Sequence, residues 1–177
     1  ATMWLLSTNT LARGISDDDA ERKLQAAPEP FTSPGGRTFR VLLAEDDDVN
    51  ALLGSCVLQK AGCLPTLVRT GREAVETVRR GLAENQPDFD IILMDIVMPD
   101  LGGIEATRAI QALYAARLGP ASIAPPIVAL TANAFAEDRQ RYLAAGLDDY
   151  LAKPFDGADL QALLARWSPR LSARTAA

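Results

Sequence analysis

The chain has 177 residues, of which 48% are hydrophobic and 23% charged, and its formal net charge is −5. This balance is that of an ordinary globular domain and excludes wholesale disorder. The negative charge excludes the basic surface that nucleic acids and anionic membranes attract, and no apolar run is long enough to cross a bilayer. We therefore expect a soluble, cytoplasmic segment with no nucleic-acid or membrane contact.

Two residue types narrow the chemistry further. The chain contains no histidine, which excludes Ser-His-Asp hydrolysis, the common zinc enzymes and a self-contained histidine kinase core. The two cysteines, Cys56 and Cys63, are too few for a disulfide framework or a zinc site. We expect both thiols to be free.

The first 38 residues differ from the rest of the chain. Ser16 and Asp19 have the spacing of a helix capping box, which predicts a short helix to about residue 26. The prolines and glycines between positions 28 and 36 then predict a linker. We expect 1–38 to be a linker or the tail of a preceding domain, 39–168 to be one domain, and 169–177 to be a C-terminal tail.

From residue 39 onward, short β-rich runs alternate with helical runs. The runs predicted as strands are 39–44, 64–68, 90–94, 127–130 and 149–152. Strands that alternate with crossover helices predict an α/β fold, with a parallel sheet covered by helices on both faces.

The helical runs carry apolar stripes and start and stop signals. Thr70 and Glu73 have capping-box spacing at the start of the second helix, and Gly62 ends the first. The stripe of the first helix, which we expect to face the core, consists of Val49, Leu52, Leu53, Cys56 and Val57. The stripe of the last helix, which begins after residue 156, consists of Leu160, Leu163, Leu164 and Trp167.

Polar residues collect where the predicted strands end. Glu45 and Asp46 follow the first strand, and Asp95 follows the third. Thr131 follows the fourth strand and Lys153 the fifth. Because the binding crevice of an open parallel sheet lies at the carboxyl ends of its strands, we expect these five side chains to share one crevice.

Three carboxylates in one crevice repel each other unless a cation relieves the repulsion. Oxygen ligands with room for water suit Mg²⁺, so Glu45, Asp46 and Asp95 form a candidate magnesium site. The alternative for any acidic residue is a solvated loop or a helix cap, and we favour it for Asp47 and Asp48 at the start of the first helix.

An aspartate in such a site can attack phosphorus and form an acyl phosphate. Catalysis of phosphoryl transfer is mostly positioning and charge neutralisation, which Mg²⁺, the Lys153 ammonium and the Thr131 hydroxyl can supply. Asp95, Lys153 and Thr131 are therefore the candidate catalytic residues.

Four segments carry a family resemblance: V-L-L-A-E-D-D-D-V-N (41–50), I-I-L-M-D-I-V-M-P-D-L-G-G (91–103), I-V-A-L-T-A-N (127–133) and D-Y-L-A-K-P (149–154). They resemble the receiver domains of two-component response regulators, most of all the C-terminal receiver of a hybrid sensor histidine kinase. The resemblance spans 39–167. It implies a flavodoxin-like, doubly wound (βα)5 fold whose five-stranded parallel sheet has the order 2-1-3-4-5.

The resemblance also implies a role for each motif residue in the crevice. Asp95 would be the phosphorylated residue, and it would bind Mg²⁺ directly together with Asp46. Glu45 would act on the metal largely through water, and the backbone carbonyl of Val97 would add a ligand. Lys153 would contact the phosphoryl group.

Further implications concern the switch. Thr131 would move toward the phosphoryl oxygens and Tyr150 would turn inward, which changes the surface of the fourth helix, fifth strand and fifth helix. The peptide bond between Lys153 and Pro154 would be cis.

The resemblance implies a phosphohistidine donor, which must lie on another domain or protein because this chain has no histidine. The partner would be a histidine kinase or a histidine phosphotransfer protein, and a homodimer stays open. The segment itself would be a phosphoacceptor with self-dephosphorylation only. Few residues follow Trp167, so we expect no downstream DNA-binding domain and, as parent, a hybrid histidine kinase rather than a stand-alone receiver.

Two other classes of protein compete with this interpretation. A Mg²⁺-dependent aspartyl-phosphate phosphohydrolase of the dehalogenase type also uses an aspartate nucleophile, but it needs a second acid two residues later, where this chain has Val97. A nucleotide-binding module needs a glycine-rich loop after the first strand, and the sequence there is acidic.

Overall fold

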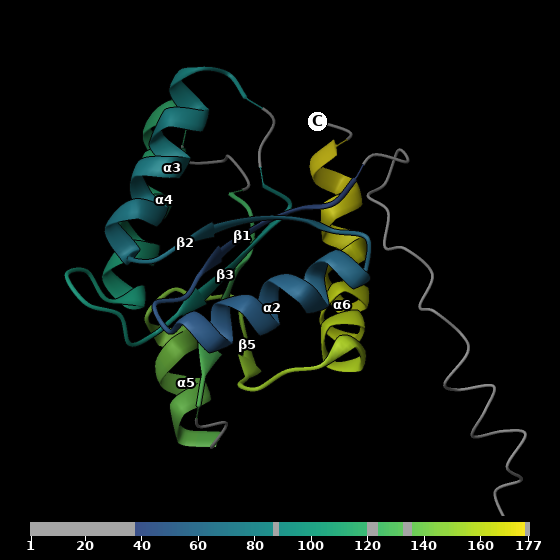
Figure 1. The fold of residues 1–177 in the computed structure, drawn as a ribbon. Coiled ribbons are helices and arrows are strands. Elements are labelled where there is room, and N and C mark those ends of the chain that lie inside the picture. Colours follow the sequence, from purple (N-terminus) through teal and green to yellow (C-terminus); the bar gives the residue numbers. More distant parts are fainter. Residues whose placement is uncertain (1–37, 87–88, 120–123, 133–135, 176–177) are drawn as a thin grey trace, which may run out of the picture.

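The computed structural model describes residues 38–86, 89–119, 124–132 and 136–175 (Figure 1). Within them, five parallel strands form one sheet in the order β2-β1-β3-β4-β5, which confirms the predicted flavodoxin-like fold. The strands are β1 (Arg40–Ala44), β2 (Leu64–Val68), β3 (Ile91–Asp95), β4 (Ile127–Thr131) and β5 (Asp149–Ala152). The helix and linker predicted before residue 38 lie outside the described residues.

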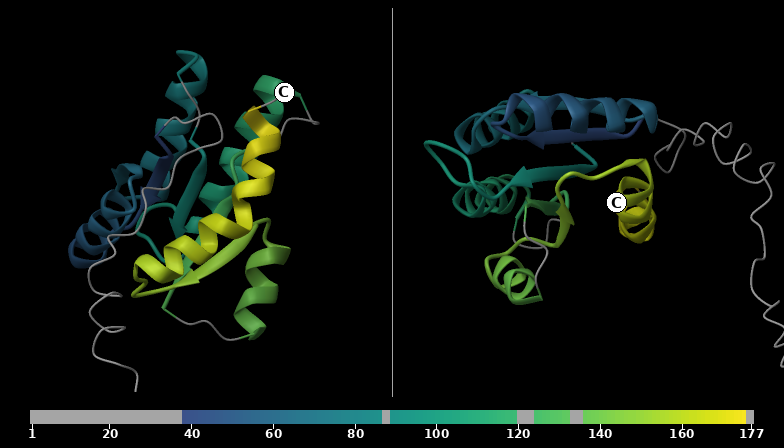
Figure 2. Two further views of the ribbon diagram at one scale, coloured as in Figure 1. Left: turned by 90° about the vertical axis from the view of Figure 1, so that its right-hand side faces the viewer. Right: turned by 60° about the horizontal axis from the view of Figure 1, so that its bottom comes forward.

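Helices cover both faces of the sheet, as Figure 2 shows. α2 and α6 lie on one face, and α3, α4 and α5 lie on the other. The helices are α2 (Asp48–Lys60), α3 (Gly71–Ala83), α4 (Gly103–Leu118), α5 (Ala136–Ala144) and α6 (Gly157–Thr175). The helices therefore cover the two faces of the sheet and leave the ends of its strands uncovered.

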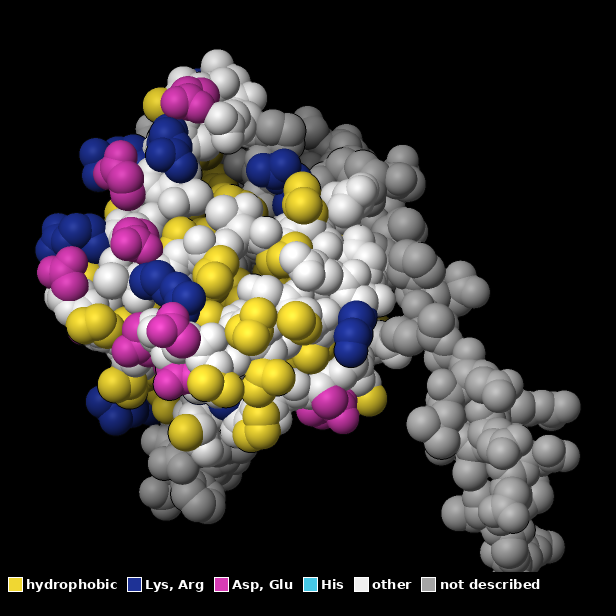
Figure 3. All heavy atoms as spheres, viewed as in Figure 1, with side chains coloured by type: hydrophobic (Ala, Val, Ile, Leu, Met, Phe, Trp, Pro, Cys, Tyr) yellow, Lys and Arg dark blue, Asp and Glu magenta, His cyan; other side chains and the backbone are white. Residues whose placement is uncertain are grey.

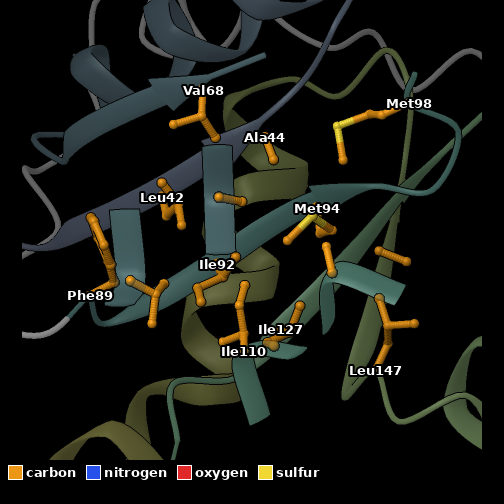
Figure 4. Packing of buried hydrophobic residues seen from close by; sticks show 14 of the residues in the cluster. Leu42, Ala44, Val68, Phe89, Ile92, Met94, Met98, Ile110, Ile127 and Leu147 are labelled. Carbon is orange, nitrogen blue, oxygen red and sulfur yellow. The ribbon is translucent and has the colours of Figure 1, made fainter. Parts of the chain in front are cut away.

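The strands divide the core into two layers. Val41 and Leu43 of β1 point toward α2 and α6, whereas Leu42 and Ala44 point toward α3 and α4. Figure 4 shows the second layer, in which these two residues pack with Ile92 and Met94 of β3 and with side chains of the covering helices. β1, β3 and β4 have apolar residues on both faces because helices cover both, which is why their sequences are continuous apolar runs.

The buried side of α2 is not the predicted one. Val49, Leu52 and Leu53 are 64%, 65% and 51% exposed, and Cys56 is also exposed. Figure 3 shows hydrophobic side chains gathered over α2 on the surface of the molecule. Of the predicted stripe, Val57 alone packs against the core. The prediction that this stripe faces the sheet was wrong.

The residues of α2 that do face the sheet are Ala51, Gly54 and Leu58. The helix lies so close to the sheet that a Cβ on Gly54 would stand 3.2 Å from the Leu43 side chain and 3.3 Å from the Phe155 ring. Because small residues are needed there, most of the larger apolar residues of α2 point outward.

The predicted helix signals are otherwise close to the structure. Asp47 caps α2 by accepting from the amides of Val49 and Asn50, and Thr70 caps α3 by accepting from the amide of Glu73. The Glu73 carboxylate accepts from the Arg69 amide, one residue further back than a standard capping box. The stripe of α6 is buried as predicted, at Leu160, Leu163, Leu164 and Trp167.

Candidate functional site

The carboxyl ends of four strands meet around a cleft of about 350 Å³. β1 is followed there by Glu45 and Asp46, and β3 ends in Asp95. β4 ends in Thr131, and Lys153 follows β5. All five predicted side chains therefore line one cleft, together with Asp47, Asn50, Ile96, Val97, Leu130, Ala132 and Tyr142.

The Lys153 ammonium joins two buried carboxylates at the floor of this cleft. Its Nζ lies 2.7 Å from Asp95 Oδ2 and 2.9 Å from Glu45 Oε2. The side chain of Glu45 is 1% exposed, that of Asp95 6% and that of Lys153 14%. Carboxylates this far from water need a cation beside them, and Lys153 is that cation in the described residues.

Burial and charge act in opposite directions on these groups. Burial raises the pKa of Glu45 above its usual value, even though the Lys153 ammonium beside it acts to lower that pKa. Burial acts to lower the pKa of Lys153, but its hydrogen bonds to Asp95 and Glu45 outweigh burial and leave that pKa raised. The lysine is therefore charged at neutral pH.

One carboxylate oxygen from each of Glu45, Asp46 and Asp95 lies within 4.8 Å of the other two. Asp46 is exposed at the mouth of the cleft, while the other two acids lie inside. One lysine cannot neutralise three carboxylates, and an all-oxygen set open to solvent on one side fits a small, partly hydrated divalent cation. The donor chemistry thus fits a metal site.

The backbone holds Asp95 in place. Its Oδ1 accepts a hydrogen bond from the Val97 amide at 3.2 Å, so both carboxylate oxygens have a donor. α4 begins directly beneath this turn, since a Cβ on Gly103 would overlap the Asp95 carbonyl. The Val97 side chain is 80% exposed and its residue lines the cleft.

Sequence reasoning missed two neighbours of Glu45. Asn50 Nδ2 lies 3.5 Å from Glu45 Oε1, and Arg69 Nη1 donates to the Glu45 carbonyl oxygen at 3.5 Å. Arg69 also pairs with Asp48 at 2.8 Å, so it links the end of β2 to the start of α2. The available signal was strand order, because β2 lies beside β1 and the residues that follow the two strands must be neighbours.

The two predicted switch residues lie in different places. Thr131 is buried in the wall of the cleft, and its Oγ1 lies 3.1 Å from the hydroxyl oxygen of Tyr142, a contact that the sequence did not predict. Tyr150 lies outside the cleft, half-buried, with the Arg139 guanidinium 5.8 Å from its ring centre. It lines a groove of about 400 Å³ next to α5, β5 and α6. The bond between Lys153 and Pro154 is cis, as predicted.

Residues 41–165 match the family of response regulator receiver domains. The chain belongs to this family. The chain is 37% identical over 161 residues to the sensor protein GacS of Pseudomonas syringae pv. syringae, a match that covers 91% of this chain and 16% of that protein. The chain therefore spans about one sixth of the length of that curated relative.

Two solved structures are similar to the receiver domain. The receiver domain of sensor histidine kinase PA1611 from Pseudomonas aeruginosa, solved with a magnesium ion coordinated in its active site cleft, is 42% identical with a TM-score of 0.61, over 75% of this chain and 98% of that one. The receiver domain of the Saccharomyces cerevisiae response regulator Ssk1, in complex with the histidine phosphotransfer protein Ypd1, is 29% identical with a TM-score of 0.64, over 76% of this chain and 92% of that one.

No helix in the described part of the chain is both long and apolar enough to span a membrane.

Proposed function

We propose that this receiver domain accepts a phosphoryl group on Asp95, with Mg²⁺ held by the carboxylates of Glu45, Asp46 and Asp95 and by the backbone carbonyl of Val97. The observation that carries the proposal is the contact of the buried Asp95 carboxylate with Lys153, at 2.7 Å, inside the acidic cleft. The magnesium ion in the PA1611 receiver supports the choice of metal.

The chemistry is one displacement at phosphorus. A carboxylate oxygen of Asp95 attacks the phosphorus of a phosphohistidine, the P–O bond forms as the P–N bond breaks, and the imidazole leaves on the partner. When bound, Mg²⁺ neutralises charge on the phosphoryl oxygens. The Lys153 ammonium, 2.7 Å from Asp95 Oδ2, would donate to the transferred group, and the Thr131 hydroxyl in the same cleft would donate a second hydrogen bond.

The donor histidine would lie on another domain of the same protein or on a separate protein, because the 177 residues of this chain contain none. The complex of the Ssk1 receiver with Ypd1 supports a histidine phosphotransfer protein as one such partner, and GacS supports a hybrid histidine kinase as the parent. In that parent, 39–168 would be the receiver domain and 1–38 a linker or the tail of the domain that precedes it.

We assign the docking of that partner to the α2 outer face, defined as the exposed side chains of Val49, Leu52, Leu53 and Cys56. This face adjoins the cleft, since Asn50 of the same helix lines it. Leu52→Glu should slow transfer from a phosphorylated histidine phosphotransfer protein and leave labelling by acetyl phosphate unchanged. Equal rates of transfer to the wild type and to Leu52→Glu would exclude the α2 outer face as the docking site.

Phosphorylation adds about two negative charges and three acceptor oxygens to the cleft. We expect Thr131 to move toward them and Tyr150 to turn inward, which alters the groove next to α5, β5 and α6. Amide chemical shifts along β5 should change on phosphorylation of the wild type and stay constant in Asp95→Asn. Constant shifts in the phosphorylated wild type would contradict this switch.

The main experiment is incubation with acetyl phosphate and Mg²⁺, followed by measurement of phosphoryl groups per chain. A receiver should approach one group per chain, lose labelling with EDTA, and show none in Asp95→Asn. Asp100→Asn is the matched control, because Asp100 is exposed in the loop after β3 and its backbone (φ 69°) suits asparagine equally well. Release of many phosphates per chain, with almost no phosphoryl group held on the chain at any time, would instead favour the phosphohydrolase alternative.

A further inference from the structure

Tyr142 places a phenol hydroxyl in the wall of the acidic cleft. It lies on α5, is 8% exposed, and belongs to the buried layer that covers β4. Its oxygen lies 3.1 Å from Thr131 Oγ1, and both residues line the same cleft as Asp95 and Lys153. The contact joins a helix to the strand-end hydroxyl that is expected to bind the phosphoryl group.

The chemistry of the two hydroxyls gives this contact a direction in the phosphorylated state. A threonine hydroxyl has one proton and two lone pairs, so it can donate to a phosphoryl oxygen only if it does not donate to Tyr142. The tyrosine hydroxyl must then donate to Thr131. A bond to an anionic oxygen is about twice as strong as one between neutral groups, so Thr131 directs its proton to the phosphoryl group. Successive hydrogen bonds polarise one another, so a donating Tyr142 makes Thr131 the better donor.

We propose that Tyr142 is a positioning residue for the phosphoryl group: its hydroxyl donates to Thr131 Oγ1 and orients the Thr131 proton toward the phosphoryl oxygens. This inference rests on the proposed function, because it takes Asp95 as the phosphoryl site. The positioning role differs from a packing role. If Tyr142 only packed in the core, its hydroxyl could donate to any nearby acceptor and would contribute nothing to binding of the phosphoryl group.

The test is binding of beryllium fluoride, a phosphoryl analogue, to the Mg²⁺-loaded protein by isothermal titration calorimetry. Tyr142→Phe keeps the ring in the core and removes the hydroxyl, and it should weaken binding about fivefold, the change expected for one lost hydrogen bond. Thr131→Val should weaken binding further. Adding Tyr142→Phe to Thr131→Val should not weaken binding any further, because the Tyr142 hydroxyl acts on the analogue only through the Thr131 hydroxyl.

Tyr114→Phe is the matched control. Tyr114 is a buried tyrosine of the same layer, on α4, and does not line the cleft. The affinity of the Tyr114→Phe variant for beryllium fluoride should equal that of the wild type. The affinity of the Tyr142→Phe variant for Mg²⁺ alone should also equal that of the wild type.

Two results would overturn the inference. One is wild-type affinity for the analogue in Tyr142→Phe; the other is a fivefold loss that persists in the Thr131→Val background. Failure of the proposed function would look different. In that case the wild type would not bind beryllium fluoride, or Asp95→Asn would bind beryllium fluoride equally well.

Discussion

Removal of the Lys153 ammonium should destabilise the protein mainly when Mg²⁺ is absent. Lys153→Met keeps an unbranched apolar chain and leaves two buried carboxylates, Glu45 and Asp95, without their cation. Loss of one partner of a buried ion pair costs about 3–5 kcal/mol. Because Lys153 is 14% exposed and the cleft opens to water past Asp46, we expect the lower end, about 3 kcal/mol.

The assay is urea unfolding followed by circular dichroism, in EDTA and in excess Mg²⁺. At a slope of about 2 kcal/mol per molar urea, a loss of 3 kcal/mol lowers the midpoint by about 1.5 M. Mg²⁺ at one hundred times its dissociation constant stabilises the native protein by about 2.7 kcal/mol. The variant should bind Mg²⁺ more tightly than the wild type, because the metal then replaces the lost ammonium, so Mg²⁺ should narrow the difference in stability.

Lys60→Met is the control for the change in net charge, because Lys60 is exposed at the end of α2. It should differ from the wild type by less than about 0.5 kcal/mol in either condition. A stability difference for Lys153→Met that is the same with and without Mg²⁺ would refute the reasoning, because it would show that the lysine and the metal do not neutralise the same carboxylates.

Three other predictions follow from packing and burial. Leu58→Ala should cost about 2–5 kcal/mol in urea unfolding, whereas Leu52→Ala on the same helix should cost less than about 0.5 kcal/mol; similar losses would contradict the orientation of α2. Burial, aided by a nearby carboxylate, raises the pKa of Cys63 to about 11. At neutral pH a thiol reagent should therefore label exposed Cys56 in the native protein and Cys63 only after unfolding, a contrast that peptide mass mapping can check. Gly103→Ala should lower the free energy of unfolding by about 1–3 kcal/mol, because its Cβ would overlap the backbone carbonyl of Asp95. The same variant should be labelled less by acetyl phosphate. Full labelling would contradict the placement of Gly103 against Asp95.

The fold and the cleft could be predicted because their signals are local. Strands such as β3 are continuous apolar runs, and a polar residue such as Asp95 marks where each one ends. Once a parallel sheet is expected, the carboxyl ends of its strands must share an edge. That rule alone places Glu45, Thr131 and Lys153 near one another.

The orientation of α2 could not be predicted in the same way. Periodicity gives weight to large apolar residues such as Leu52 and Leu53, but here the sheet side is occupied by Ala51 and Gly54, which a hydrophobicity pattern hardly registers. Their small size matters only because of the distance between helix and sheet, which is a property of the packed structure. The outward leucines are consistent with a surface selected for binding rather than for the core.

Contacts between elements were the other part that the sequence did not reveal. Tyr142 is a buried core residue, and its hydroxyl contacts the Thr131 hydroxyl only because α5 packs against β4. Arg69 directly follows β2, and its contact with the Glu45 carbonyl depends on strand order.

The measurement that tests the central claim most directly is reductive trapping of the acyl phosphate. The protein is phosphorylated with acetyl phosphate and Mg²⁺, treated with borohydride, which reduces an aspartyl phosphate to homoserine, and mapped by peptide mass spectrometry. We predict homoserine at position 95 and at no other aspartate. Homoserine at position 46, or an unmodified Asp95 in a protein that carries phosphate, would contradict the account.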